Sequence, residues 1–409
     1  MTLRTLFLRA SDFAHPTARA TPVRLVQSPA RFLDLRRRHP SVKGSHVSGR
    51  ASLKIGILLG DDIGPEVVPE CVKVMQAAAA HERLDIEWRP LPIGKRGHEE
   101  HGHTLPSVTE QGLRELHGWI MGPIGHAAYP RGDATWVMPP VRKRFDLFAA
   151  VRPSLSHAGI PSIHKNVDIV FLRELSEGML YSETVVAGLP EFRPNDDITV
   201  AMRVITRKGS NRVAREAFEI ARTRERKKVT AAHKEPVYRL ACGMFAEECR
   251  KVARDYPDVA FEEMMIDSIA MKLVTAPQQF DVIVTTNQFG DILTDIGAGL
   301  VGGLGLAPGL CVGERQAMAQ ATHGSAPDIA GRNIANPYAM IMSGQMLLAW
   351  LGRRHKEPTA SAAARGIEAA VARVIAEGKH LTRDLGGEAS TTQMGDAIAA
   401  AVKGSGPVR

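Results

Sequence analysis

A strand, a helix and a second strand follow one another where the chain first becomes regular, and this alternation restricts the fold more than any other feature. Residues 53–60 (LKIGILLG) form a short apolar run ending in glycine, which two aspartates follow, so they predict a buried strand that enters a loop. Pro65 marks a helix start, and residues 65–80 carry apolar side chains at helical spacing before a second strand at 85–91. This order predicts an α/β fold.

The same alternation continues along the chain. We expect further strands at 168–175, 196–205, 227–234, 261–267 and 280–287, and helices at 210–224, near 237–254, at 337–352 and at 358–378. Ser210 is a candidate cap for the first of these helices. Since a single core rarely grows to 409 residues, we expect two lobes.

The positive charge of the chain is confined to its first 50 residues. The whole chain carries a formal charge of +8, residues 1–50 hold ten Lys and Arg against two acids, and the remaining 359 residues hold 42 of each. A protein that binds a nucleic-acid backbone is expected to carry its excess charge on the folded body. We therefore expect no nucleic-acid partner.

Residues 1–50 are rich in Arg and poor in acids, and they contain no apolar run long enough for a signal peptide or a membrane span. An organellar transit peptide, a disordered tail and translated upstream sequence all fit this composition, and we expect little order there. The four cysteines show no CxxC or zinc spacing, which is typical of buried thiols in a reducing compartment. The expected location is cytoplasmic, or the mitochondrial matrix if the segment is a transit peptide.

Three aspartates follow predicted strands near the middle of the chain. Asp291 and Asp295 stand four residues apart, so both carboxylates would project from one face of a helix, close enough to share a cation. The spacing also fits a solvated acidic first turn favoured by the helix dipole. Asp267 has the same strand-to-helix context, and carboxylates are the ligands that Mg²⁺ or Mn²⁺ prefers, so we interpret all three as a candidate metal site.

Basic residues supply the complementary half of this candidate site. Arg142, Arg152 and Arg173 lie in apolar surroundings, where a guanidinium needs a partner, so they are candidates for holding a substrate with two or three carboxylates. Structural ion pairs are the alternative for each of them. Lys234 follows a predicted strand and is a candidate for proton transfer, although most lysines in such positions lie on the surface.

Residues 323–337 (HGSAPDIAGRNIANP) form a loop with glycine and proline breaks that could wrap a polar ligand or could be an ordinary surface loop. The chain has no GxGxxG dinucleotide motif, because Pro308 stands where GGLGLAPG would need its third glycine.

Several of these strings, taken in order, resemble the β-decarboxylating dehydrogenases that act on isopropylmalate, isocitrate, homoisocitrate, and tartrate or D-malate. The matching strings are GDDIGPEV, DLFAAVRP, FLREL, YPDVAFEEMMIDSIAM, FDVIVTTNQFGDILTD and HGSAPDIAGRNIANP, and the likeness runs from Lys54 into the C-terminal helices. DLFAAVRP and FLREL look most like isopropylmalate dehydrogenase, whereas GLVGGLGLAPG looks more like the isocitrate and homoisocitrate enzymes.

The resemblance implies two doubly wound lobes with the active-site cleft between them, in a homodimer. Residues 51–147 and 302–409 would form the first lobe and residues 148–301 the second, following the extension at 1–50. It implies that Arg142, Arg152 and Arg173 bind substrate carboxylates, that Asp267, Asp291 and Asp295 hold Mg²⁺ or Mn²⁺, and that Lys234 and Asp267 act in proton transfer and reach into the partner's active site.

The resemblance also implies that the loop binds the adenosine half of a nicotinamide cofactor, through His323, Gly324, Ser325, Ala326, Asp328, Ile329 and Asn336. Asp328 can accept both ribose hydroxyl protons and would repel a 2′-phosphate, which favours NAD over NADP.

The chain departs from the family pattern at several positions. The tyrosine that would protonate the product falls on Leu180, with Tyr181 one residue later, and a one-residue bulge would restore it. Asp62, Pro236 and Gln320 replace a glycine, an asparagine and an acid. Residues 135–141 (TWVMPPV), where the substrate side chain is selected, match neither main branch, so 3-isopropylmalate is the expected substrate with tartrate, D-malate, isocitrate and homoisocitrate as alternatives. A catalytically silent regulatory or structural paralogue is the alternative of another class.

Overall fold

The structure is a computed structural model that describes residues 52–125, 129, 137–179 and 191–404. One large sheet holds ten strands in the order β2-β1-β3-β12-β11-β4-β5-β10-β8-β9. Their bounds are β1 Leu53–Leu58, β2 Ile86–Pro90, β3 Gly118–Met121, β4 Ala149–Leu155, β5 Asp168–Glu174, β8 Lys228–His233, β9 Ala260–Met265, β10 Val282–Thr285, β11 Leu310–Val312 and β12 Ala317–Ala319. The predicted α/β class is confirmed.

Strand direction reverses in the middle of this sheet. The strands β1, β2, β3 and β12 are mutually parallel, and so are β5, β10, β8 and β9, while β11 and β4 join the two groups through antiparallel pairs. The strands β3 and β10 are buried along their whole length, as is typical of parallel strands covered on both faces. Because β5, β8, β9 and β10 are parallel, the residues that follow them meet at one edge of the sheet.

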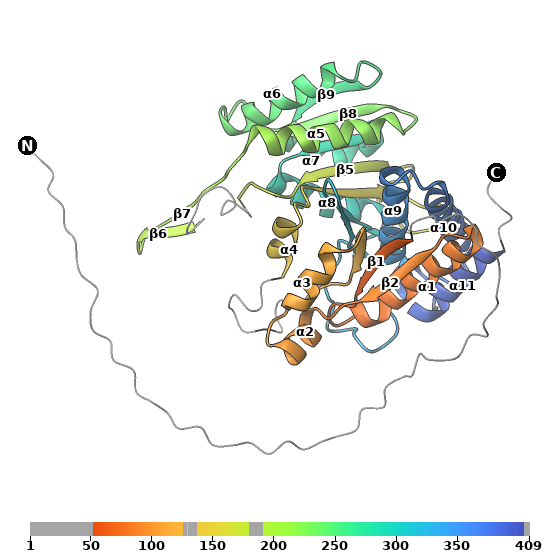
Figure 1. Ribbon diagram of the computed structural model, residues 1–409. Helices are drawn as coiled ribbons and strands as arrows, with labels where there is room; N and C mark the ends of the chain where they lie inside the picture. Colours follow the sequence, from red (N-terminus) through yellow and green to blue (C-terminus); the bar gives the residue numbers. More distant parts are fainter. Residues whose placement is uncertain (1–51, 126–128, 130–136, 180–190, 405–409) are drawn as a thin grey trace, which may run out of the picture. The chain divides into compact units, whose positions relative to one another are not determined.

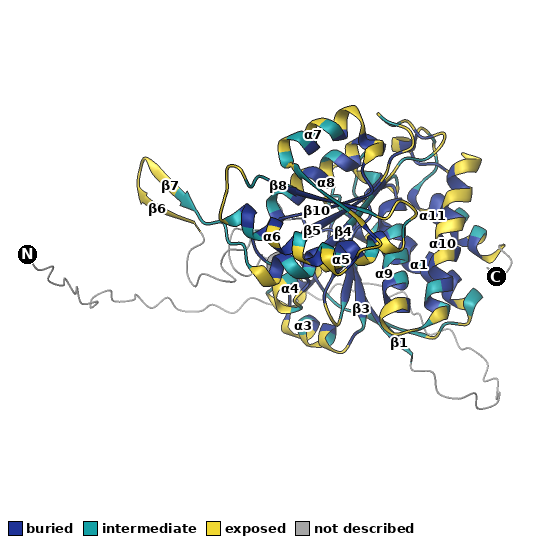
Figure 2. Cartoon of the chain, turned by 90° about the horizontal axis from the view of Figure 1, so that it is seen from above, coloured by how far each residue is buried: buried dark blue, intermediate teal, exposed yellow. Residues whose placement is uncertain are grey.

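The longer helices of the first part of the chain are α1 Gly64–Glu82, α5 Arg207–Arg222, α6 Ala241–Arg254, α7 Ile266–Thr275 and α8 Asn287–Val301, and they are followed by α9 Tyr338–Arg354, α10 Pro358–Glu377 and α11 Thr391–Lys403. Three short helices, α2 Gly94–His101, α3 Ser107–Arg114 and α4 Met138–Arg144, lie between β2 and β4. The helices α5 and α8 lie on opposite sides of β4, β5 and β10 (Figure 2). Buried residues fill the sheet between them.

Both ends of the described chain pack together. The helix α1 lies beside α11 (Figure 1), and Lys73 of α1 contacts Asp396 of α11 at 2.6 Å. One sheet runs through both predicted lobes, crossing their proposed boundary at the β11–β4 pair. The division into 51–147 plus 302–409 and 148–301 stays a prediction. None of the helices in the described ranges is long and apolar enough to span a membrane.

Two sequence expectations differ locally from the structure. The strand expected at 196–205 is only β7 Ile198–Ala201, which pairs with β6 Glu191–Asn195 in a separate, largely exposed hairpin. Ser210 does not cap α5. Thr206 does, because its hydroxyl accepts a hydrogen bond from the Gly209 N–H, and Ser210 is buried within the first turn.

Candidate active site

The helix α8 carries two of the predicted metal ligands and packs directly on β5. A Cβ atom on Gly290 would lie 2.6 Å from the Arg173 Cγ, and one on Gly297 would lie 2.5 Å from the Phe171 ring. Glycine at both positions therefore allows the helix backbone to approach the strand. This close approach places Asp291, which follows Gly290, against Arg173.

Arg173 is the penultimate residue of β5 and is almost fully buried, with 3% of its surface exposed. Its Nε and Nη2 donate to the Asn287 Oδ1 at 3.0 and 2.8 Å, and its Nη1 forms an ion pair with Asp291. Two neighbours on α8 thus satisfy this buried cation.

Arg152 reaches the same helix from β4. Its Nη1 donates to the Thr294 hydroxyl at 2.6 Å and lies 3.9 Å from the Asp291 carboxylate. Burial lowers the pKa of Arg152, and the positive charge of Arg142 lowers it further. The two predicted substrate arginines are therefore close enough to repel each other, which an anionic ligand would relieve.

Asp295 lies one turn beyond Asp291 and is not in an ion pair within the described residues. Partial burial raises the pKa of Asp295, the charge of Arg152 opposes this shift, and the charge of Asp291 adds to it. A divalent cation between Asp291 and Asp295 would offset that repulsion and that desolvation. The donor set on α8 fits Mg²⁺ or Mn²⁺.

A pocket of about 160 Å³ opens beside these residues. Its lining includes Arg142 and Arg152, together with Met138, Gln320, Thr322 and His323, and no lining residue among the described positions carries a carboxylate. Gln320 is a neutral amide where the family pattern has an acid. Its Oε1 lies 3.5 Å from the Arg142 Nη2. The Thr322 hydroxyl and the His323 Nε2 are buried without a hydrogen-bond partner in the described parts of the chain. The pocket suits an anion with additional oxygen atoms.

Asp267, the third predicted metal ligand, lies beside Lys234. Lys234 follows β8, Asp267 lies in the first turn of α7, and the Lys234 Nζ donates to the Asp267 carboxylate at 2.7 Å. This hydrogen bond is the main cause that lowers the pKa of Asp267. Among the described residues of one chain, Asp267, Asp291 and Asp295 do not form a group whose oxygens all lie within 4.8 Å of one another. One chain alone therefore brings two of the three aspartates together.

The predicted adenosine loop packs on the loop after β1. The Ile63 N–H donates to the Ser325 carbonyl at 3.2 Å, and the Gly331 N–H donates to the Glu66 carboxylate at 2.5 Å. Gly324 and Asp328 are exposed, while Ser325, Ala326 and Ile329 are half-buried. Ala326 has a φ of +46°, a conformation that costs energy for a residue with a side chain and shows how tightly the loop turns.

Two members of this loop differ in how free they are to bind a ligand. Burial lowers the pKa of His323, which keeps its ring neutral, and its unpartnered Nε2 fits a hydrogen bond to a cofactor. The Asn336 amide instead donates to Asp384 at 2.8 Å and accepts from the Tyr338 N–H at 2.9 Å. Asn336 therefore has a structural role within the chain, alongside its predicted contact.

Sequence reasoning missed two polar residues at the site and a buried aspartate in the loop after β1. Asn287 and Thr294 bind the arginines, and both lie inside the NQFGDILTD string, where their position on the face of Asp291 could have indicated them. Asp61 is buried and accepts hydrogen bonds from the Lys95 N–H, the Gly125 N–H and the Tyr129 hydroxyl at 2.7 to 2.8 Å. Tyr181, the predicted proton donor, lies outside the described residues.

Comparison with known proteins identifies the family. The family model for isocitrate/isopropylmalate dehydrogenase matches residues 54–398. The 3-isopropylmalate dehydrogenase of Archaeoglobus fulgidus is 40% identical over 348 residues, which is 85% of this chain and 98% of that protein. The isocitrate/homoisocitrate dehydrogenase of Thermus thermophilus is 39% identical over 350 residues, with 86% and 98% covered.

A solved structure agrees with these relatives. The crystal structure of isocitrate dehydrogenase from Methylococcus capsulatus superimposes with a TM-score of 0.76 at 39% identity, and covers 86% of this chain and 99% of that one. The chain therefore belongs to the isocitrate/isopropylmalate dehydrogenase family and is an oxidatively decarboxylating dehydrogenase.

Proposed function

We propose that the protein oxidises and decarboxylates an (R)-malate-type 2-hydroxy acid with NAD and Mg²⁺ or Mn²⁺, and that 3-isopropylmalate is its substrate. One observation carries the proposal: Arg142 and Arg152 line one pocket, and Arg152 and Arg173 both reach Asp291. A small acid with two carboxylates can neutralise these guanidinium groups while its hydroxyl faces the aspartates.

The chain's own residues divide the work. The arginines bind and orient the carboxylates, and Lys234 with Asp267 accepts the proton of the substrate hydroxyl as the hydride leaves. When bound, the cation would supply Lewis-acid stabilisation of the negative charge that develops on the substrate oxygen, and NAD would accept the hydride. Tyr181 is the proposed donor of the proton that replaces the lost CO₂.

The choice of NAD rests on the loop after β12. Asp328 presents an exposed carboxylate there, and it can accept hydrogen bonds from the two hydroxyls of an unmodified ribose. A ribose 2′-phosphate would meet a like charge at the same position. A relative in Arabidopsis thaliana that is 38% identical is named isocitrate dehydrogenase [NAD] catalytic subunit 5.

A homodimer completes the proposed site. Large apolar side chains are exposed on α7 and α8, where Met271, Val274 and Ile292 each show more than half of their surface. Leu240, in the turn after Lys234, is 89% exposed in the single chain. A second copy covering this surface would bury these residues and could bring its own Lys234 and Asp267 to the first copy's Asp291 and Asp295.

The cytoplasm is the proposed compartment. All four cysteines are free and buried, which fits a reducing environment. Detection of the mature protein with residues 1–50 removed in a mitochondrial fraction would refute this location.

The test is an assay of the purified full-length chain with Mn²⁺ and NAD⁺ on 3-isopropylmalate, D-malate, tartrate, isocitrate and homoisocitrate. We expect NADH with 3-isopropylmalate foremost, and a much lower rate when NADP⁺ replaces NAD⁺. A higher rate with another acid would refute the substrate, and no NADH with any of them would refute the proposed function. Ile292→Asp should give a monomer without activity, and an active monomer would refute the shared site.

A further inference from the structure

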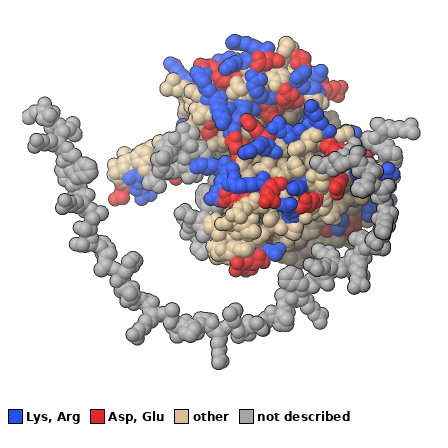
Figure 3. Space-filling view, viewed as in Figure 1, with Lys and Arg blue, Asp and Glu red and all other residues tan. Residues whose placement is uncertain are grey.

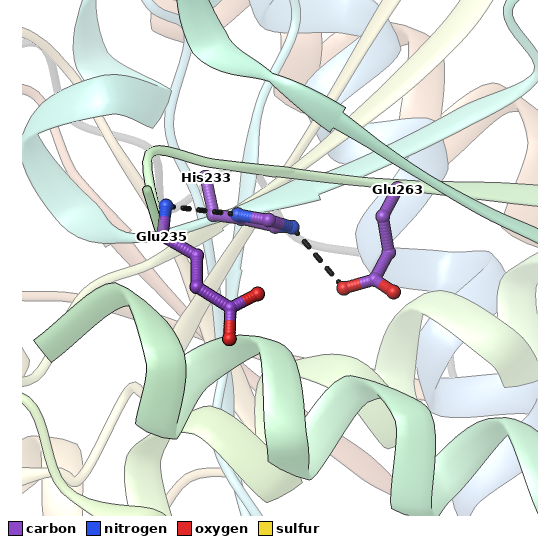
Figure 4. A group of neighbouring side chains, drawn as sticks. All are labelled: His233, Glu235 and Glu263. Carbon is purple, nitrogen blue, oxygen red and sulfur yellow. Dashed lines mark hydrogen bonds and ion pairs between the residues drawn. The ribbon is translucent and has the colours of Figure 1, made fainter. Parts of the chain in front are cut away.

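Four charged and polar side chains, two of them on the residues that flank Lys234, form a ring that takes no part in the proposed chemistry. His233 and Glu235 flank Lys234 at the end of β8, Glu263 lies on β9, and Arg250 lies on α6. Figure 4 shows the ring nitrogens of His233 facing Glu235 on one side and Glu263 on the other.

The hydrogen bonds of these residues form a closed circuit. The Glu235 N–H donates to the His233 Nδ1 at 3.2 Å, so the hydrogen of the neutral imidazole lies on Nε2, which donates to Glu263 at 3.1 Å. Arg250 donates from its Nε to the other Glu263 oxygen at 2.9 Å, and from its Nη2 to the Glu235 side chain at 2.6 Å. The circuit begins and ends on Glu235.

A histidine and two carboxylates within 4.8 Å of one another can also bind a metal ion, but this group is already occupied. Both nitrogens of His233 are engaged, and the guanidinium of Arg250 lies between the carboxylates. Its hydrogen bonds, first to Glu263 and then to Glu235, raise the pKa of Arg250. The cation of this site is therefore the arginine itself.

The circuit connects the two strands that carry the proposed proton-transfer pair. In the β8–β9 register His233 is opposite Met265 and Ala231 is opposite Glu263, so the His233–Glu263 bond fixes how the ends of both strands meet. Lys234 leaves the end of β8, and Asp267 follows two residues after the end of β9. On the other side of the lysine, the Lys234 carbonyl accepts hydrogen bonds from the Val237 and Tyr238 N–H at 3.1 and 2.9 Å, which close a tight turn through Glu235 and Pro236.

We propose that His233, Glu235, Arg250 and Glu263 are positioning residues that hold Lys234 against Asp267 for proton transfer. This inference rests on the proposed function of Lys234. Neither carboxylate of the ring needs to touch the substrate, because Glu235 acts on the backbone that follows the lysine and Glu263 acts through His233 on the backbone that precedes it. A lysine whose backbone is released would be misplaced relative to the substrate, and small misplacements of a reacting group reduce kcat strongly.

Glu235 offers the cleanest test, because its side chain contacts Arg250 and is partly exposed. Glu235→Ala removes the contact, whereas Glu235→Gln keeps an oxygen that can accept from Arg250. Glu247→Ala is the matched control, since it removes an arginine–glutamate ion pair of 3.0 Å from the same helix α6, away from Lys234. Glu263→Ala is a second variant, and it removes the contacts of Glu263 with both His233 and Arg250.

Two measurements apply to each full-length variant. The first is kcat and KM for the best substrate with saturating Mn²⁺ and NAD⁺. The second is the rate at which acetic anhydride modifies Lys234, followed by mass spectrometry of the peptide that contains it. We expect kcat to fall about tenfold in Glu235→Ala and in Glu263→Ala with little change in KM, faster acetylation of Lys234, and recovery of both in Glu235→Gln.

The proposal is overturned if Glu235→Ala and Glu263→Ala match Glu247→Ala in kcat and in acetylation, or if Glu235→Gln is as impaired as Glu235→Ala. A wild-type chain that makes no NADH refutes the proposed function instead. In that case the acetylation rates alone decide whether the ring positions the lysine.

Discussion

Replacing Gly290 by alanine tests whether the close packing of α8 on β5 builds the substrate site. The new Cβ atom would lie 2.6 Å from the Arg173 Cγ and 2.7 Å from its Cβ, whereas ordinary contacts begin near 3.4 Å. The helix or the arginine must therefore move by the difference, 0.8 Å. Arg173 is buried under α8, so the movement must also disturb its contacts with Asn287 and Asp291.

The expected cost combines two opposing terms. Alanine favours a helix over glycine by about 1 kcal/mol, and overpacking a filled interior costs about 1 to 3 kcal/mol. We expect Gly290→Ala to destabilise the protein by about 1 kcal/mol. Because misplacing a binding group by about 1 Å can cost about 100-fold in rate, we expect kcat/KM to fall by about 10-fold to 100-fold.

The matched control is Gly366→Ala on α10. A Cβ atom there would meet nothing within 4 Å, so the alanine should stabilise the protein by about 1 kcal/mol through helix propensity and leave activity unchanged. Chemical denaturation gives the stability of each variant, and steady-state NADH formation gives its activity. The reasoning is refuted if Gly290→Ala is stabilised like Gly366→Ala and remains fully active.

Three further changes test other parts of the site and core. Asp291→Asn should abolish the activation by Mn²⁺ without unfolding the chain, and unchanged titration of activity with Mn²⁺ would exclude it as a ligand. Burial, and next the charge of Glu177, raise the pKa of Glu174 to about 7 from 4.5, so the folded chain keeps a proton that the unfolded chain releases. The free energy of unfolding should therefore fall by on the order of 3 kcal/mol as pH rises from 4.5 to about 7. Glu174→Gln should remove this part of the decrease, as measured by chemical denaturation below and above this pH range. Burial raises the pKa of Cys71 to about 12 and also raises the pKa of Cys249, so Ellman's reagent should modify these two thiols only when the protein unfolds. Rapid labelling of either thiol in the native chain would contradict this.

The sequence predicts a strand or helix of this fold well where the residues of that element alone show its hydrophobic pattern. The helix expected at 65–80 is α1 Gly64–Glu82, and the strand expected at 168–175 is β5 Asp168–Glu174. The cap of α5 was wrong because Ser210 and Thr206 are both good capping residues, and only the packing of the first turn decides between them. The pattern also gives no sign that strand direction reverses at β11 and β4, since pairing depends on residues far apart in the chain.

The candidate site was predictable in its residue types more than in its contacts. The four-residue spacing of Asp291 and Asp295 is local, and the helix preserves it. The partners of these residues come from β4 and β5, more than a hundred positions earlier, so spacing could not indicate that Arg173 pairs with Asp291. The separation of Asp267 from the other two aspartates depends on how one chain folds, and a local sequence pattern does not indicate it.

Pro236 illustrates how a departure from a family pattern can be misread. By sequence alone, a proline in place of an asparagine two residues after the lysine favours the alternative of a catalytically silent paralogue. In the structure the neighbouring Glu235 enters a circuit with Arg250 and Glu263, 15 and 28 residues further along the chain. Pro236 lies inside the turn that the Val237 and Tyr238 N–H close on the Lys234 carbonyl, where a proline fits because its nitrogen donates no hydrogen bond. The circuit and the turn therefore hold the backbone on both sides of Lys234 without an asparagine at position 236.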